Sequence, residues 1–153
     1  MKGMTIIVKK VTQIIAGVIF LYGLYITIQG HLSPGGGFAG GTIIAGSFIL
    51  LVLAFGNDVL GLVKKEIRSS FIEALGIFLF ILTASGAIIL SFYLNYDKIF
   101  FKNFLTKGVP GEIVSAGFIP LLNIFIGMEV AAALFTLFLA FVIKSEEKEE
   151  KKK

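Results

Sequence analysis

The chain has 153 residues, of which 56% are hydrophobic and only 16% are charged, whereas a soluble domain carries about 25% charged residues. This composition excludes a soluble globular domain, and it excludes intrinsic disorder, whose signature is low hydrophobicity. The formal net charge is +4, but the basic residues flank apolar stretches, so they indicate orientation in a membrane rather than a nucleic-acid partner. The sequence therefore predicts an all-α integral membrane protein of the plasma membrane, surrounded by the lipid bilayer.

The first half of the membrane portion is a run of 47 residues, 11–57, without Asp, Glu, Lys or Arg. As one α-helix it would be about 70 Å long, more than twice the hydrocarbon core of about 30 Å. Within the run, residues 30–37 have the sequence GHLSPGGG, whose proline and four glycines break helical continuity. The run is therefore predicted to be a hairpin of two membrane-spanning helices, residues 11–29 and 37–55, joined by a tight turn.

Two further apolar stretches complete the membrane portion, and each is long enough to cross a bilayer: residues 70–94 and 113–143. The second is longer than a crossing requires, and Pro120 near its start predicts a helix break there. The predicted organisation is one domain, residues 1–143, of four transmembrane helices arranged as two hairpins. A charged cytoplasmic tail, residues 144–153, follows and is predicted to continue the last helix.

Basic residues are distributed unequally between the two sides of this arrangement. With four crossings, both termini and the connection between the second and third spans share one side, which carries eleven Lys and Arg residues, and the other side carries three. Because basic loops are retained in the cytoplasm, both termini are predicted to be cytoplasmic. On the outer side, the aromatic and basic residues of segment 95–111 indicate an anchor at the membrane interface.

The turn of the first hairpin is the first candidate site. It cannot be a phosphate-binding loop, because it lacks the Gly-Lys-Ser/Thr motif and a preceding strand. Most of its glycines fit a tight turn, and Gly37, Gly41 and Ala45 fit a small-residue face for close helix packing. A turn does not need His31, which is either a structural hydrogen-bonding residue or part of the mouth of an outer pathway. The outer hairpin motif comprises Gly30, His31, Pro34, Gly35, Gly36, Gly37, Phe38, Gly40 and Gly41.

Glu129 is the second candidate, because it is the one charged residue of segment 113–143 and lies near the bilayer midplane. An acidic group at that depth costs about 2.5–3.5 kcal/mol on insertion scales, so it faces protein or water. It is interpreted as a cation or proton site; the alternative is a structural hydrogen bond to Asn123 or to a neighbouring subunit. The candidate ion pathway comprises Glu129, His31 and Asn123. Glu73, near the cytoplasmic interface, is either an entry residue or a structural one.

The chain offers no residues for catalysis or for a resident metal or cofactor. One histidine and no cysteine cannot build the usual metal sites, and no nucleophile accompanies a base. No enzymatic activity is expected of this chain alone. Any Na⁺ or H⁺ that it handles would be a transported ion.

Two segments carry a resemblance to a known family. Residues 30–41, GHLSPGGGFAGG, resemble the most distinctive stretch of the MnhB/MrpB family, whose members are small membrane subunits of the Mrp-type multisubunit sodium/proton antiporters. Residues 119–130, IPLLNIFIGMEV, are similar to the proline–asparagine–glycine segment of that family. The resemblance implies an accessory membrane subunit beside large antiporter-like subunits. Such modules also occur in archaeal membrane-bound hydrogenases and sulfur reductases, where peripheral redox subunits drive ion pumping.

Several functions remain open at this point. In the first, the chain is a non-catalytic subunit of a sodium- or proton-translocating module, and Glu129 and the His31 turn contribute to a cation path. In the second, the chain is a scaffold whose glycines and Glu129 serve only packing between subunits. A free-standing channel or carrier is disfavoured, because the chain has too few polar residues for a complete pathway.

Overall fold

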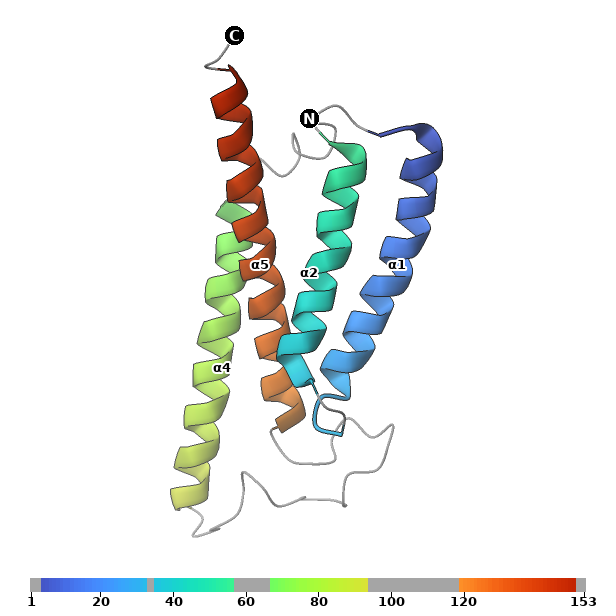
Figure 1. Ribbon diagram of the computed structural model, residues 1–153. Coiled ribbons are helices and arrows are strands. Elements are labelled where there is room, and N and C mark those ends of the chain that lie inside the picture. Colours follow the sequence, from blue (N-terminus) through green and yellow to red (C-terminus); the bar gives the residue numbers. More distant parts are fainter. Residues whose placement is uncertain (1–3, 33–34, 57–66, 94–118, 151–153) are drawn as a thin grey trace.

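The computed structural model describes residues 4–32, 35–56, 67–93 and 119–150. These ranges contain four α-helices, α1 (Ile6–Ile28), α2 (Gly36–Phe55), α4 (Ile67–Tyr93) and α5 (Ile119–Glu150), and no strand (Figure 1). Each helix is long and apolar enough to cross a membrane. The chain is therefore a multi-pass membrane protein, and the predicted all-α fold class with four spans is confirmed.

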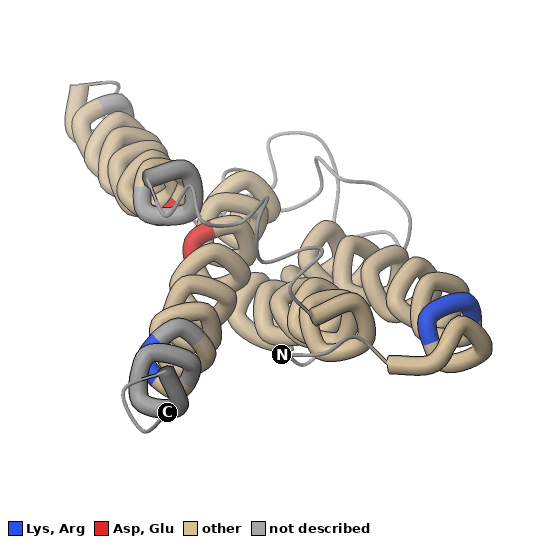
Figure 2. Tube along the Cα trace, turned by 90° about the horizontal axis from the view of Figure 1, so that it is seen from above, with Lys and Arg blue, Asp and Glu red and all other residues tan. Residues whose placement is uncertain are grey.

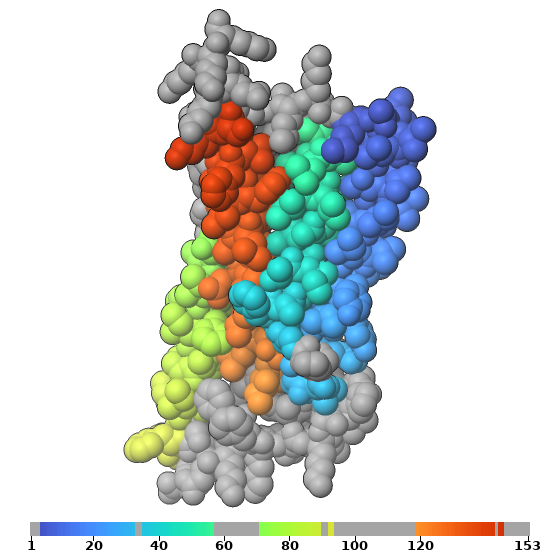
Figure 3. All heavy atoms as spheres, in the orientation of Figure 1, coloured from blue at the N-terminus to red at the C-terminus, as the bar shows by residue number. Residues whose placement is uncertain are grey.

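The helices form an open row. In Figure 1, α5 lies between α4 and α2, and α1 packs against α2 on the far side from α4. Among the described elements α4 contacts α5 alone. Figure 3 shows the four helices side by side in this order. The start of α1 and the end of α5 lie at the same end of the row, here called the terminal end. That this end is cytoplasmic remains a prediction.

The hairpin forms where the glycines predicted it. Gly35 and Gly36 have φ of 128° and 58°, values that side chains other than glycine rarely adopt. The Leu32 N–H donates to the carbonyl of Gln29 and so tightens the turn after α1. α2 ends at Gly56, which also has a positive φ of 62°. The predicted hairpin of two spans is thus confirmed in outline.

α1 begins at Ile6, five residues before the predicted start at residue 11. The predicted span began after the basic residues, but Lys9 lies inside α1. Its Nζ is 5.2 Å from the centroid of the Phe55 ring at the end of α2. A lysine can occupy the edge of a membrane helix because its aliphatic stem lies along apolar surface while its ammonium stays in the polar interface. Charge therefore marks the membrane boundary and not the helix boundary.

The other two spans agree with their predicted ranges in the part that the structure describes. α4 lies close to the predicted 70–94, and α5 continues to Glu150, as predicted for the tail. Pro120 is the second residue of α5 and is buried; in the first turn a proline costs little, because its missing N–H would be unpaired anyway. The segment 95–111 and residues 113–118 lie outside the described residues, so a break before Pro120 stays a prediction.

The row buries few side chains completely. Its largest apolar cluster contains Val52, Leu139 and Val142, with Phe135 and Phe138 packed against it. The Phe48 ring lies between helices, with centroids 5.7 Å from Phe20 and 5.8 Å from Phe135. Both outer helices, α1 and α4, expose large apolar residues along most of their length. The described part of the chain therefore forms no closed bundle around an interior.

Candidate functional site

Two glycines of the hairpin motif bring α2 against α5. A Cβ on Gly37 would overlap the backbone carbonyl of Asn123. A Cβ on Gly41 would lie 2.5 Å from the carbonyl oxygen of Gly127 and 3.0 Å from Cβ of Val130. Only glycine allows these backbones to approach so closely. The predicted small-residue face of α2 is confirmed at both positions.

Thr27 joins α1, α2 and α5 next to this contact. It is 4% exposed, and its Oγ1 donates a hydrogen bond of 2.9 Å to the carbonyl of Gly23 one turn earlier. A Cβ on Gly40 would overlap Oγ1 of Thr27, and a Cβ on Gly127 would lie 2.6 Å from its Cγ2. The threonine side chain therefore fills the space that two glycines on two other helices leave open. The sequence reasoning missed Thr27; its spacing of four from Gly23 was the available signal.

Replacing Thr27 by leucine is expected to destabilise the chain, because a larger side chain must enter the space beside Gly40 and Gly127. Overpacking of this kind costs about 1–3 kcal/mol. The matched control is Thr42→Leu, since Thr42 makes an equivalent 2.9 Å bond to the carbonyl of Phe38 but is exposed. Thermal unfolding in detergent measures both variants. Equal losses of stability would contradict the role assigned to Thr27.

Asn123 lies at the turn of the α1–α2 hairpin. A Cβ on Gly30 would lie 3.0 Å from Nδ2 of Asn123, and a Cβ on Gly36 would lie 3.3 Å from its Oδ1. The amide thus sits between the end of α1 and the start of α2. His31 follows Gly30 directly, and its Nδ1 atom is buried. The structure therefore places Asn123 against Gly30, the residue that precedes His31, and this region with Asn123 and His31 is here called the hairpin site.

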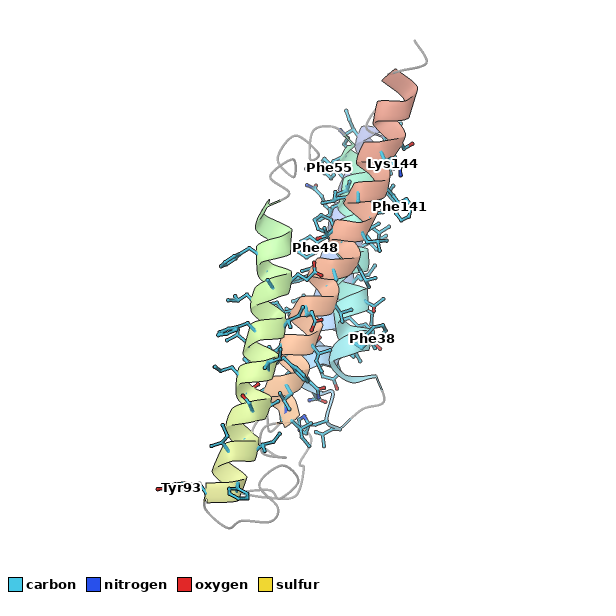
Figure 4. All side chains as sticks on the ribbon, turned by 90° about the vertical axis from the view of Figure 1, so that its left-hand side faces the viewer. Phe38, Phe48, Phe55, Tyr93, Phe141 and Lys144 are labelled. Atoms are coloured by element: carbon cyan, nitrogen blue, oxygen red, sulfur yellow. The ribbon has the colours of Figure 1, made fainter. Side chains whose placement is uncertain are left out.

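The remaining motif residues have different surroundings. Gly35 adopts the positive φ described above and Gly40 contacts Thr27. Phe38 is 65% exposed, and in Figure 4 it projects away from the helices. Pro34 lies outside the described residues.

Glu129 lies on another face of α5, against α4. It is near the middle of the 24-residue apolar segment Ile119–Val142. A Cβ on Gly76 of α4 would lie 3.0 Å from Cβ of Glu129 and 3.2 Å from its Cα. Figure 2 shows the acidic segment of α5 on the side next to α4. Gly76 therefore lets the α4 backbone pass directly over Glu129, a contact that the sequence reasoning did not anticipate.

Glu73 shares this contact region. It precedes Gly76 by three residues, so it lies on the same face of α4, about 4.5 Å nearer the terminal end. Both glutamates are partly exposed. They are the two acidic side chains that the structure describes in these helices, and together with Gly76 they form what is here called the α4–α5 acid site.

The predicted pathway residues thus fall into two separate places. Asn123 and Glu129 are six residues apart on α5, which corresponds to about 9 Å along the helix and about 120° around it. The hairpin site faces α1 and α2, whereas the acid site faces α4. Within the described residues no group of three or more His, Cys, Asp or Glu side chains could hold a metal ion.

Comparisons with known proteins identify the family. A family model described as a domain related to the MnhB subunit of Na⁺/H⁺ antiporters matches residues 7–136, a range that contains both sites. The chain is 41% identical over 127 residues to uncharacterized protein MJ1307 of Methanocaldococcus jannaschii, covering 81% of this chain and 46% of that protein.

Staphylococcal relatives carry a functional name. The chain is 44% identical over 61 residues to "Putative antiporter subunit mnhB2" of Staphylococcus epidermidis, covering 39% of this chain and 43% of that protein. It is 32% identical over 107 residues to the protein of the same name from Staphylococcus aureus, covering 70% and 68%. The chain thus spans less than half the length of the first two relatives. Because the family model covers most of its length, the chain belongs to the MnhB family.

Proposed function

We propose that this chain is a non-catalytic membrane subunit of a multisubunit sodium/proton antiporter module. Membership of the MnhB family and the names of the staphylococcal relatives support this function. The observation that carries it is the position of Glu129, a carboxyl group in the middle of an apolar helix and in contact with Gly76. An acidic residue at that depth is expensive to insert and usually has a task in ion movement.

The open row of helices supports a subunit rather than a complete transporter. The described helices enclose no interior, and the hairpin site and the acid site lie on different faces of α5. A cation crossing the membrane needs polar groups along its whole path. Neighbouring subunits therefore complete any path to which this chain contributes.

The acid site offers the chemistry for Na⁺ or H⁺. Carboxylate oxygens bind hard cations and exchange protons, and no resident cofactor is required. A cation that enters from the terminal end would meet Glu73 before Glu129, one helical turn deeper. The hairpin site, with His31 and Asn123, would border the opposite mouth of the path.

A scaffold role is the second candidate, and one observation favours it. The close contacts of Gly36 and Gly37 with Asn123 account for part of the hairpin motif by packing alone. In that case Glu129 would serve assembly and no ion would visit it. Substitution of Glu129 separates the two candidates, as argued in the Discussion.

Purification of the tagged chain from native membranes in mild detergent tests the proposed function. Large antiporter subunits are expected to co-purify with it. Additional subunits with nickel–iron or iron–sulfur centres would assign the module to a redox-driven hydrogenase or sulfur reductase. Recovery of the chain without any other membrane subunit would contradict the proposal.

The proposed orientation places both termini in the cytoplasm, and cysteine labelling can test it because the native chain has no cysteine. In intact cells a membrane-impermeant maleimide is expected to label Leu32→Cys in the hairpin turn and not Ser145→Cys near the end of α5. In inverted vesicles the pattern should reverse. Labelling of Ser145→Cys in intact cells would show the opposite orientation.

A further inference from the structure

Four residues of α5 form an outward ridge, defined by Glu129, Ala133, Leu137 and Phe141. Residues spaced by four are neighbours on a helix surface, and such rows pack into the grooves of an adjacent helix. The exposed fraction of the side chain rises to 57% at Leu137 and 68% at Phe141. In Figure 4, Phe141 lies on the side of α5 away from α4. The ridge therefore runs diagonally from the acid site onto open surface.

The lower end of the ridge is acidic, and no described basic side chain lies near it. Glu129 is partly exposed, and no ion pair joins it to any described residue. The basic side chains that the structure describes are Lys9, Lys10 and Lys144 (Figure 2). Even Lys144, on the same helix, is about 22 Å from Glu129 along the axis. A surface with a carboxyl group at mid-membrane is unfavourable against lipid, which offers no hydrogen-bond donor.

A second copy of this chain could not supply the missing group. Its apolar segments 11–57, 74–96 and 113–143 contain no Lys or Arg. Their one histidine, His31, follows Gly30 at the level of Asn123, about 9 Å from Glu129 along α5. No parallel pairing of two copies therefore brings a base to the depth of Glu129. The complementary group must therefore come from a different chain. We propose that the α5 ridge docks a transmembrane helix of a partner subunit, and that this helix places a Lys, Arg or His opposite Glu129. The proposal rests on the proposed function in one respect, that the chain is a subunit of a larger module.

Photo-crosslinking in the whole module, purified in mild detergent, tests this docking surface. A photoreactive amino acid at position 133 lies one turn from Glu129 on the ridge. The matched control is position 21 on α1, where Leu21 is 66% exposed. Thr27 of α1 contacts the position of Gly127 of α5, so these two residues lie at the same depth. Position 21 on α1 and position 133 on α5 are each six residues nearer the terminal end than this contact. The two probes therefore sit at the same depth on different faces.

We expect position 133 to crosslink to a partner's membrane span that has Lys, Arg or His within about one turn of the link. Position 21 should give no link to that span. If the bulk of the probe at position 133 prevents assembly, the probe is placed at position 137 instead, where the native Leu137 is already large and exposed. Links from the ridge only to lipid, to another copy of this chain, or to a span without a basic residue would overturn the proposal.

Charge reversal gives a second readout that does not depend on transport. Glu129→Lys is expected to lower the yield of intact module at least tenfold, and exchange of the crosslinked partner base for Glu should restore it. If the crosslink forms while Glu129→Gln leaves transport unchanged, the docking surface stands and the ion path fails. If transport falls but the ridge crosslinks only to lipid, the docking surface fails and the ion path stands.

Discussion

Replacing Gly37 by alanine will destabilise the chain, whereas the same replacement at Gly46 in the same helix will not. A Cβ at Gly37 meets the Asn123 backbone, while a Cβ at Gly46 meets nothing within 4 Å. The added methyl group must push α2 away from α5. This overpacking should lower the free energy of unfolding by an amount at the upper end of about 1–3 kcal/mol. At Gly46, alanine instead gains up to about 1 kcal/mol of helix propensity.

Thermal unfolding of the purified chain in detergent measures this pair of variants. Because both variants add one methyl group to α2, changes in hydrophobicity and in detergent binding are matched. The expected shifts in melting temperature have opposite signs. A destabilisation of similar size at both positions would show that α2 needs glycine for another reason, and the close α2–α5 contact would lose its support.

Replacing Glu129 by glutamine is expected to reduce sodium-coupled proton transport by the module while the module remains assembled. Glutamine keeps the shape of the side chain, but it replaces one acceptor oxygen by an NH₂ donor and cannot carry a charge or exchange a proton. The loss of a hydrogen bond to a charged group costs about 1.5–3 kcal/mol, which corresponds to about a tenfold fall in rate or more. Glu150→Gln, at the far end of α5, is the control and should transport normally.

Two measurements on the same preparation separate the candidate functions. Native electrophoresis reports assembly, and the initial rate of sodium-dependent proton exchange in vesicles reports transport. A low rate with an intact module supports the ion path. Loss of the module with Glu129→Gln would show that Glu129 serves assembly, through the scaffold role or through the partner base proposed above. An unchanged rate in an intact module would remove Glu129 from the path.

Features that depend on the chain alone were predictable from the sequence. The charge-free run 11–57 is too long for one crossing and contains a turn that only glycine and proline explain, so the hairpin followed from elementary lengths. Glu129 was identifiable because apolar residues of similar number precede and follow it in segment 113–143, which predicts a position near the middle of the membrane. The close-packing role of Gly37 and Gly41 followed from their spacing of four.

Features that depend on which helices become neighbours were not predictable. Gly46 and Gly76 are both single glycines in apolar helices, yet Gly46 faces open space and Gly76 contacts Glu129. No local signal distinguishes them, because the difference arises from the position of α4 and α5 in the row. The spacing of Thr27 from Gly23 was a local signal for its hydrogen bond, but its contacts with Gly40 and Gly127 depend on the neighbouring helices. By contrast, the six-residue spacing of Asn123 and Glu129 already excluded a common helix face.

Sodium-dependent proton exchange in inverted membrane vesicles tests the central claim most directly. Vesicles that contain the complete module should exchange sodium for protons, and vesicles whose module lacks only this chain should not. The purified chain alone in liposomes should give no exchange. Full exchange without the chain, or exchange by the chain alone, would contradict its assignment as a subunit of the antiporter module.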